Sequence, residues 1–121
     1  MATESQTIGS TKVFENDKII VWDFQLEPGE ETAIHTHKNS YMWYAIQGGD
    51  LDCEDENGND LGVFEVPDKG VFNLKLEGDQ LEVISEIAKG VKFPATHKAK
   101  NISDTTYHEI IIEFKQSVRT L

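Results

Sequence analysis

The chain has little cysteine, little positive charge and no long apolar run. Its single cysteine, Cys53, excludes an internal disulfide and suits a reducing cytoplasm, where we expect the protein to be located. Eleven Lys and Arg stand against 22 Asp and Glu, and the net charge of −11 argues against nucleic acid and anionic membrane surfaces as partners. No run approaches the length of a membrane-crossing helix, and Met1–Lys12 lacks the apolar core of a secretion signal.

The sequence also lacks a convincing helical period, a Gly-rich phosphate loop and a recognisable nucleophile motif. What it contains is a series of short apolar runs separated by turn residues, of which Asn57-Gly58 is the strongest hairpin signal. The pattern predicts an all-β sandwich or barrel. The expected strands cover residues 20–26, 32–37, 41–47, 51–54, 60–66, 71–76, 81–87, 91–93, 96–102 and 107–114.

A chain of 121 residues predicts one compact domain. Residues 1–12 are polar, and we expect them to form a flexible N-terminal arm before a single domain over residues 13–118. Because a short all-β domain leaves sheet edges exposed and buries a limited core, we expect a homodimer.

Two closely spaced histidines are the most informative feature. In a β-strand, side chains two residues apart point to the same face, so His35 and His37 would direct both imidazoles into one space. The same parity places Tyr41 and Trp43 on the inward face, and His97 offers a distant third imidazole. The spacing predicts a metal-centred pocket, whereas the simpler interpretation is that strand histidines and packing aromatics merely line a surface.

Three neutral imidazoles would leave the +2 charge of a metal ion uncompensated and would leave coordination positions open. Such a site favours an anionic small-molecule ligand, such as a carboxylate. It suits Zn, Fe, Ni, Cu or Mn, and the sequence does not choose among them. Tyr41 could ligate the metal or transfer a proton, because a nearby cation would lower the pKa of its phenol.

Two segments resemble the paired motifs of the cupin superfamily, of the small RmlC-like, conserved-barrel type. The first motif of that family reads Gly, five residues, His-x-His, three or four residues, Glu and a later Gly. Here Gly29 to His37 matches it, followed by Tyr41 and Gly49. The second stretch, Pro94 to Asn101, is a looser match, because Pro94 and His97 are only three apart. The resemblance runs from about Val21 to Phe114, and Tyr41 occupies the motif-glutamate position.

The resemblance implies a double-stranded β-helix, a small jelly-roll-like barrel with a divalent transition metal inside. Carried over by position, the metal ligands would be His35, His37 and His97. We predict Tyr41 as a catalytic residue, and Trp43 and Asn101 as substrate-binding residues. The leading functional hypothesis is a metal-dependent enzyme of oxygenase, lyase or isomerase type that acts on a small carboxylate-bearing metabolite. The alternative is a non-catalytic small-molecule-binding cupin without bound metal, which the missing glutamate favours.

Other residues receive simpler interpretations. His108 shares a face with Ile110, Ile112 and Phe114, which indicates a core-edge histidine. Cys53 has inward parity and is interpreted as a small buried hydrophobe. Tyr44 has the opposite parity to Tyr41 and Trp43 and is expected to face outward.

Overall fold

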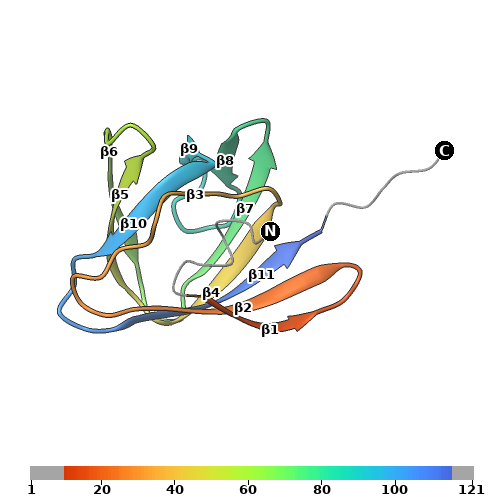
Figure 1. Cartoon of the computed structure of the whole chain (residues 1–121), viewed down its shortest axis with the longest axis horizontal. Coiled ribbons are helices and arrows are strands. Elements are labelled where there is room, and N and C mark those ends of the chain that lie inside the picture. Colours follow the sequence, from red (N-terminus) through yellow and green to blue (C-terminus); the bar gives the residue numbers. More distant parts are fainter. Residues whose placement is uncertain (1–9, 116–121) are drawn as a thin grey trace.

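The computed structural model describes residues 10–115, which form β-strands and connecting loops (Figure 1). The prediction of an all-β fold is therefore confirmed. No helix with the length and hydropathy needed to cross a membrane occurs among the described residues. The strands in chain order are β1 (Ser10–Glu15), β2 (Ile19–Leu26), β3 (His35–Thr36), β4 (Tyr41–Gln47), β5 (Gly49–Asp55), β6 (Asp60–Val66), β7 (Val71–Glu77), β8 (Gln80–Val83), β9 (Lys92–Pro94), β10 (Thr96–Asn101) and β11 (Tyr107–Phe114).

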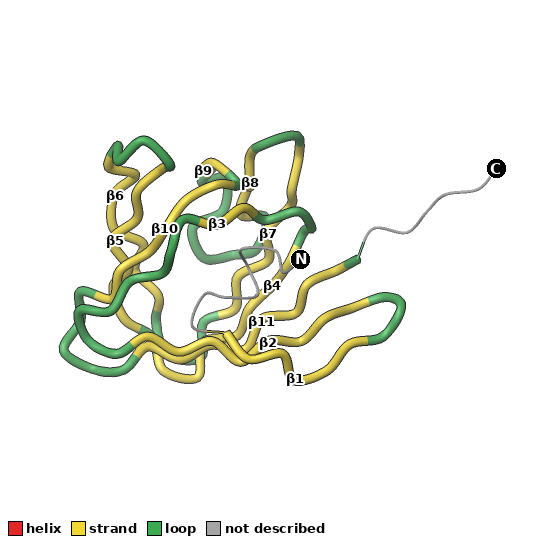
Figure 2. The backbone as a smooth tube through the Cα atoms, in the orientation of Figure 1, coloured by secondary structure: helices red, strands yellow, loops and turns green. Residues whose placement is uncertain are grey.

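The strands build two antiparallel sheets that face each other across the core (Figure 2). The larger sheet has the order β1-β2-β11-β4-β7-β8-β9, and the smaller has the order β3-β10-β5-β6. β11 comes last in the chain yet lies between β2 and β4, because it pairs with both. The two-sheet arrangement is the jelly-roll-like barrel that the sequence predicts.

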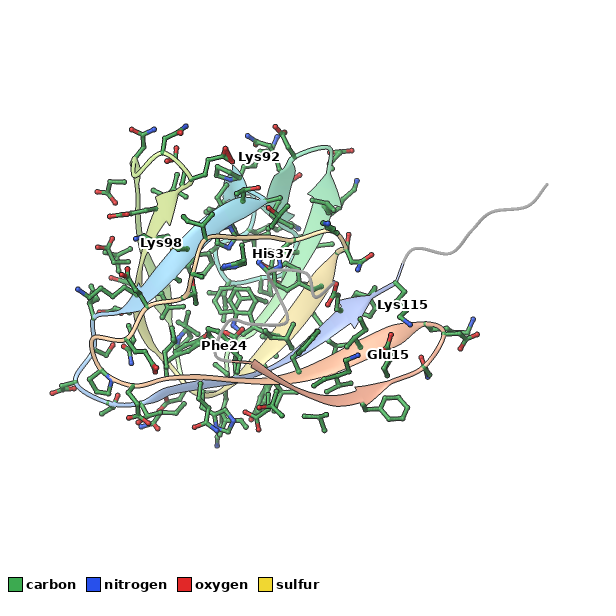
Figure 3. The ribbon with its side chains drawn as sticks, in the orientation of Figure 1. Glu15, Phe24, His37, Lys92, Lys98 and Lys115 are labelled. Atoms are coloured by element: carbon green, nitrogen blue, oxygen red, sulfur yellow. The ribbon has the colours of Figure 1, made fainter. Side chains whose placement is uncertain are left out.

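Period-2 alternation of apolar residues fills the space between the sheets. In β2 the inward residues are Trp22, Phe24 and Leu26, and all of them are buried. β4 contributes Tyr41 and Trp43 in the same way, whereas Tyr44 on its other face is 43% exposed, as predicted. Burying each large apolar side chain stabilises the fold by roughly 1.5–3 kcal/mol. Figure 3 shows Phe24 and His37 in the interior, while Lys98 lies at the periphery.

Several predicted boundaries are wrong. β1 includes residues 10–12, which were expected in the flexible arm. Backbone hydrogen bonds pair β1 with β2, and such bonds form whether the side chains are polar or apolar. β3 covers only His35–Thr36 of the predicted 32–37 strand. β8 ends at Val83. The remainder of the predicted arm, residues 1–9, and residues 116–118 of the predicted domain lie outside the described residues.

The inward face of β11 is also opposite to the prediction. Tyr107 and Glu109 are the buried residues, and His108 lies on the other face, where its Nε2 is 2.8 Å from Asp23 Oδ1. The apolar residues beside it face outward because they join other apolar side chains on the outer surface of the larger sheet. There Ile110 pairs with Tyr44 and Ile112 pairs with Met42.

Candidate metal centre

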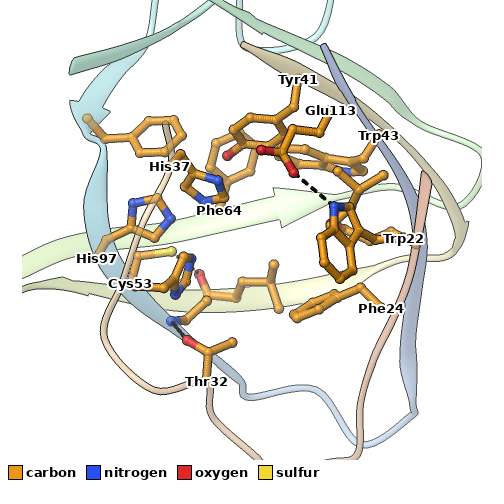
Figure 4. Close-up of a pocket in the computed structure, with 16 residues that line it drawn as sticks. Trp22, Phe24, Thr32, His37, Tyr41, Trp43, Cys53, Phe64, His97 and Glu113 are labelled. Carbon is orange, nitrogen blue, oxygen red and sulfur yellow. Dashed lines mark hydrogen bonds between the residues drawn. The ribbon is translucent and has the colours of Figure 1, made fainter. Parts of the chain in front are cut away.

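The smaller sheet brings the three predicted ligand histidines together. His35 on β3 and His97 on β10 are direct cross-strand partners, so their side chains project from the same face. His37 follows β3, and its backbone N–H donates to Ala95 O at 2.9 Å, which continues the pairing with the segment before β10. One ring nitrogen from each histidine lies within 4.8 Å of the others. Figure 4 shows His37 and His97 directed toward the same space.

Backbone carbonyl groups orient two of the three imidazoles. His35 Nδ1 lies 3.0 Å from Ala33 O, and His97 Nδ1 lies 2.7 Å from Pro94 O. A carbonyl oxygen only accepts hydrogen bonds, so each Nδ1 must carry the proton and donate it. Each Nε2 of a neutral ring is then left with a free lone pair. Carbonyl groups that fix the tautomer in this way are the usual support for histidine ligands of metals.

Burial keeps the three rings uncharged at neutral pH. Desolvation, with a contribution from His97, lowers the pKa of His35 to about 4. Desolvation and the two neighbouring histidines lower the pKa of His37 well below its usual value. Desolvation also lowers the pKa of His97, although the bond to Pro94 opposes the change. Because only a neutral imidazole ligates a metal, the cluster is already in the protonation state that binding requires.

The donor set fits a divalent transition metal. Zinc–nitrogen bonds of about 2.0–2.1 Å in tetrahedral geometry place two ligand nitrogens about 3.4 Å apart. The three ring nitrogens lie within 4.8 Å of one another, so the rings would move toward each other to bind one ion. Three nitrogen ligands leave positions open for water or a substrate atom, as in catalytic rather than structural sites.

Tyr41 lies against the histidines. Its ring stacks on His37 with centroids 4.4 Å apart and an interplanar angle of 19°. Burial, with a smaller effect from Glu109, raises the pKa of Tyr41 well above its ordinary value. The group is therefore a neutral phenol that can donate a hydrogen bond, and no carboxylate stands at this position.

Trp43 forms the next part of the wall. It is 6% exposed, and its ring stacks on Tyr41 and on Phe72, with centroids 6.0 Å and 4.7 Å away. Burial raises the pKa of the neighbouring Tyr107 well above its ordinary value. Among residues 10–115, Trp43 Nε1 is buried without a hydrogen-bond partner.

Asn101 does not line the cavity, which corrects its prediction as a substrate-binding residue. Its side chain is fully buried, and Nδ2 donates to Leu26 O at 2.9 Å and to Thr105 O at 2.8 Å. Its Oδ1 accepts from the backbone N–H of Ser103 at 2.9 Å. The amide is therefore occupied by the backbone of the connecting loops. Asn101 shares the inward parity of His97, but it lies four residues farther along β10.

A cavity of about 90 Å³ is lined by the three histidines and holds more than the volume that one water molecule needs. Its wall is mainly aromatic and aliphatic, and no Lys or Arg is among the residues that line it. The polar lining residues that sequence reasoning missed are Thr32, Glu109 and Glu113. The lining consists of Trp22, Phe24, Thr32, His35, His37, Tyr41, Trp43, Leu51, Cys53, Phe64, Phe93, His97, Ala99, Glu109, Ile111 and Glu113.

The two missed glutamates come from the inward face of β11 and have different environments. Glu113 Oε1 accepts from Trp22 Nε1 at 2.9 Å, and Oε2 accepts from Asn39 Nδ2 at 2.6 Å. Glu109 is 6% exposed, and burial raises its pKa to about 8 although the Tyr107 hydroxyl donates to it. Sequence reasoning would have found these residues only by predicting correctly which face of β11 points into the barrel. Their charge alone indicates a solvated surface.

No protein-family model matches the sequence, and no curated protein matches it. Solved structures do resemble it. A cupin domain from Bordetella pertussis Tohama I is 22% identical, with a TM-score of 0.56 over 88% of this chain and 92% of that one. An RmlC-like cupin family protein from Methanocaldococcus jannaschii is 11% identical, with a TM-score of 0.57 over 90% and 81% of the two chains.

A sugar phosphate isomerase from a cupin superfamily, from Silicibacter pomeroyi, is 14% identical, with a TM-score of 0.56 over 93% of this chain and 62% of that one. At these identities the likeness establishes the fold and nothing finer. The chain has the cupin double-stranded β-helix fold, as its motifs predict.

Proposed function

We propose that this protein is a metal-dependent enzyme that acts on a small carboxylate-bearing metabolite, with a reaction of oxygenase, lyase or isomerase type. The observation that carries the proposal is the convergence of three neutral imidazoles, two of them with Nδ1 bonded to a backbone carbonyl, at one cavity. The fold alone does not select the reaction, because the same barrel supports many chemistries.

His35, His37 and His97 would hold the metal. A bound divalent ion would supply Lewis acidity and a positive charge that attracts a substrate carboxylate. Within residues 10–115, no Lys or Arg lines the cavity, so the described lining offers no cationic side chain that would compete with the ion for an anionic group. The aromatic wall would exclude water from the bound molecule. Tyr41 stacks on His37, which supports a role for its hydroxyl group in moving a proton.

Metal content tests the centre directly. We expect about one transition metal ion per chain in protein purified without added metal, and almost none in His35→Ala, because removing one of three ligands leaves too few donors. Elemental analysis measures this. His108→Ala is the matched control, since His108 lies outside the cluster beside Asp23. Equal metal content in His35→Ala and the parent protein would show that the site is wrongly assigned.

The role of Tyr41 is tested separately. Tyr41→Phe keeps the ring that stacks on His37 and removes only the hydroxyl group. We expect full metal content with turnover reduced by about 10²-fold or more, the range of general acid–base contributions. Turnover on an identified substrate, measured together with metal content, provides the comparison. Unchanged turnover would remove Tyr41 from the mechanism.

A non-catalytic binding module is the second candidate. The neutral phenol of Tyr41 at the motif-glutamate position favours it, because the centre then lacks the anionic ligand that the motif normally supplies. Failure of the purified protein to bind metal at any concentration would support this candidate over the first.

The predicted homodimer and the cytoplasmic location stay predictions. Apolar residues on the outer face of the larger sheet support the dimer, since Tyr44, Ile46 and Val71 are 43%, 47% and 40% exposed.

A further inference from the structure

Glu109 lines the part of the cavity farther along β11 from the histidines. Along β11, the cavity-lining residue Glu113 pairs with Tyr41, which stacks on His37, whereas Glu109 pairs with Ala45 and Phe24. The next inward residue, Tyr107, is fully buried. Four residues of strand separate the two glutamates, or about 13 Å of rise. We call Glu109 and Tyr107 the cavity floor.

One hydrogen bond links the two residues of the cavity floor. The Tyr107 hydroxyl donates to Glu109 Oε1. Among residues 10–115 this is the one hydrogen bond that Glu109 makes. Its second oxygen is therefore free for a ligand, because Glu109 lines the cavity.

In the metal-free protein, no described residue that lines the cavity gives Glu109 a cationic partner. Among residues 10–115 the lining contains no Lys or Arg, and burial holds His35 neutral. Desolvation accordingly raises the pKa of Glu109 to about 8. A buried carboxyl group without a cationic partner retains its proton, and a protonated carboxyl group both donates and accepts a hydrogen bond.

We propose that Glu109 acts as a neutral carboxylic acid that recognises an uncharged hydroxyl or carbonyl group at the far end of the ligand. This inference rests on the proposed function. The ligand class is then a hydroxy or oxo acid, whose carboxylate lies toward the three histidines and whose neutral polar group lies at the cavity floor. The competing ligand is an amino acid. Its ammonium group would bind to the aromatic wall and to an ionised Glu109. The absence of a counter-ion around Glu109 favours the neutral ligand.

Three probes with the same four-carbon chain separate these possibilities: butanoate, 4-hydroxybutanoate and 4-aminobutanoate, together with the next shorter and longer homologues of each. Dissociation constants are measured by calorimetry at pH 7 on the zinc-loaded protein. We expect the best hydroxy acid to bind about tenfold tighter than the matching simple acid, as one satisfied buried hydrogen bond allows. The amino acid should bind no better than the simple acid.

Two variants test the role of Glu109 itself. Glu109→Gln keeps a neutral donor and acceptor, so it should retain the preference for the hydroxy acid. Glu109→Leu removes both and should reduce that preference to less than about threefold. Glu65→Leu is the matched control, because Glu65 is an exposed residue on β6 and does not line the cavity; the preference should persist there.

The proposal is overturned if 4-aminobutanoate binds best, if Glu109→Gln loses the preference as fully as Glu109→Leu, or if no probe binds. Equal affinities for all probes with zinc bound would also overturn it, and the metal centre would stand. A hydroxy-acid preference that disappears in Glu109→Leu, in protein that fails to bind zinc, would support recognition by Glu109 and refute the proposed metal centre. Zinc content is therefore measured on every sample.

Discussion

The two ends of the cavity respond to burial in opposite ways. At the histidine end, desolvation removes protons and leaves three lone pairs available. At the cavity floor, the same desolvation makes Glu109 retain its proton. Both effects follow from one rule, that a low-dielectric interior disfavours whichever form is charged. The three histidines and Glu109 are therefore all uncharged near neutral pH. A bound metal ion and a substrate carboxylate would be the charges that enter the cavity.

The largest expected change in the free energy of unfolding comes from replacing Glu109 at the cavity floor. The pKa of Glu109 rises from 4.5 in the unfolded chain to about 8 in the folded one, so between these values the unfolded state has lost a proton that the folded state keeps. Stability therefore falls as pH rises through this window, by up to about 1.4 kcal/mol per pH unit. We expect Glu109→Gln to abolish that loss and to be more stable than the parent protein at pH 8.

Chemical denaturation at pH 5 and pH 8 measures this difference. Glu65→Gln, at an exposed position, is the control and should follow the parent protein at both values. Parallel pH profiles for Glu109→Gln and the parent protein would mean that the carboxyl group is ionised in the folded state.

A smaller effect is expected at the histidine end, in protein stripped of metal. The pKa of His35 falls from 6.5 when unfolded to about 4 when folded. Here the unfolded state gains a proton first, so stability is lost as pH falls from about 6.5 to about 4, again by up to about 1.4 kcal/mol per pH unit. His35→Gln should show a shallower acid limb than the parent protein in chelator-treated samples. His108→Gln serves as the control, and an acid limb unchanged by His35→Gln would contradict the assignment.

Sequence reasoning located the histidine end well. Histidine spacing, the inward parity of Tyr41 and Trp43, and the motif around His97 all rest on local alternation, which survives folding intact. The cross-strand pairing of His35 with His97 then follows from the cupin topology. The fold class was accessible for the same reason, since it depends on many short alternating runs and on turn residues.

The cavity floor was not accessible in this way. In β11, Ile110, Ile112 and Phe114 have the pattern of a core face, and only the register with β2 and β4 shows that they face outward. On that pattern Glu109 would lie on the outer face. Asn101 was misplaced for a related reason: parity specifies the side of a strand, but it does not specify which residues on that side line the cavity.

β3 is short and lies at the border of the smaller sheet, where it pairs with β10 alone. It holds His35 and leads directly to His37, while His97 belongs to the better-anchored β10. Detaching this brief segment would withdraw two donors at once and leave the rest of the barrel intact. Local openings of this kind require less free energy than global unfolding. Exchange of an ion at this centre would therefore be governed by fraying of a single border strand, on a timescale independent of the stability of the whole domain.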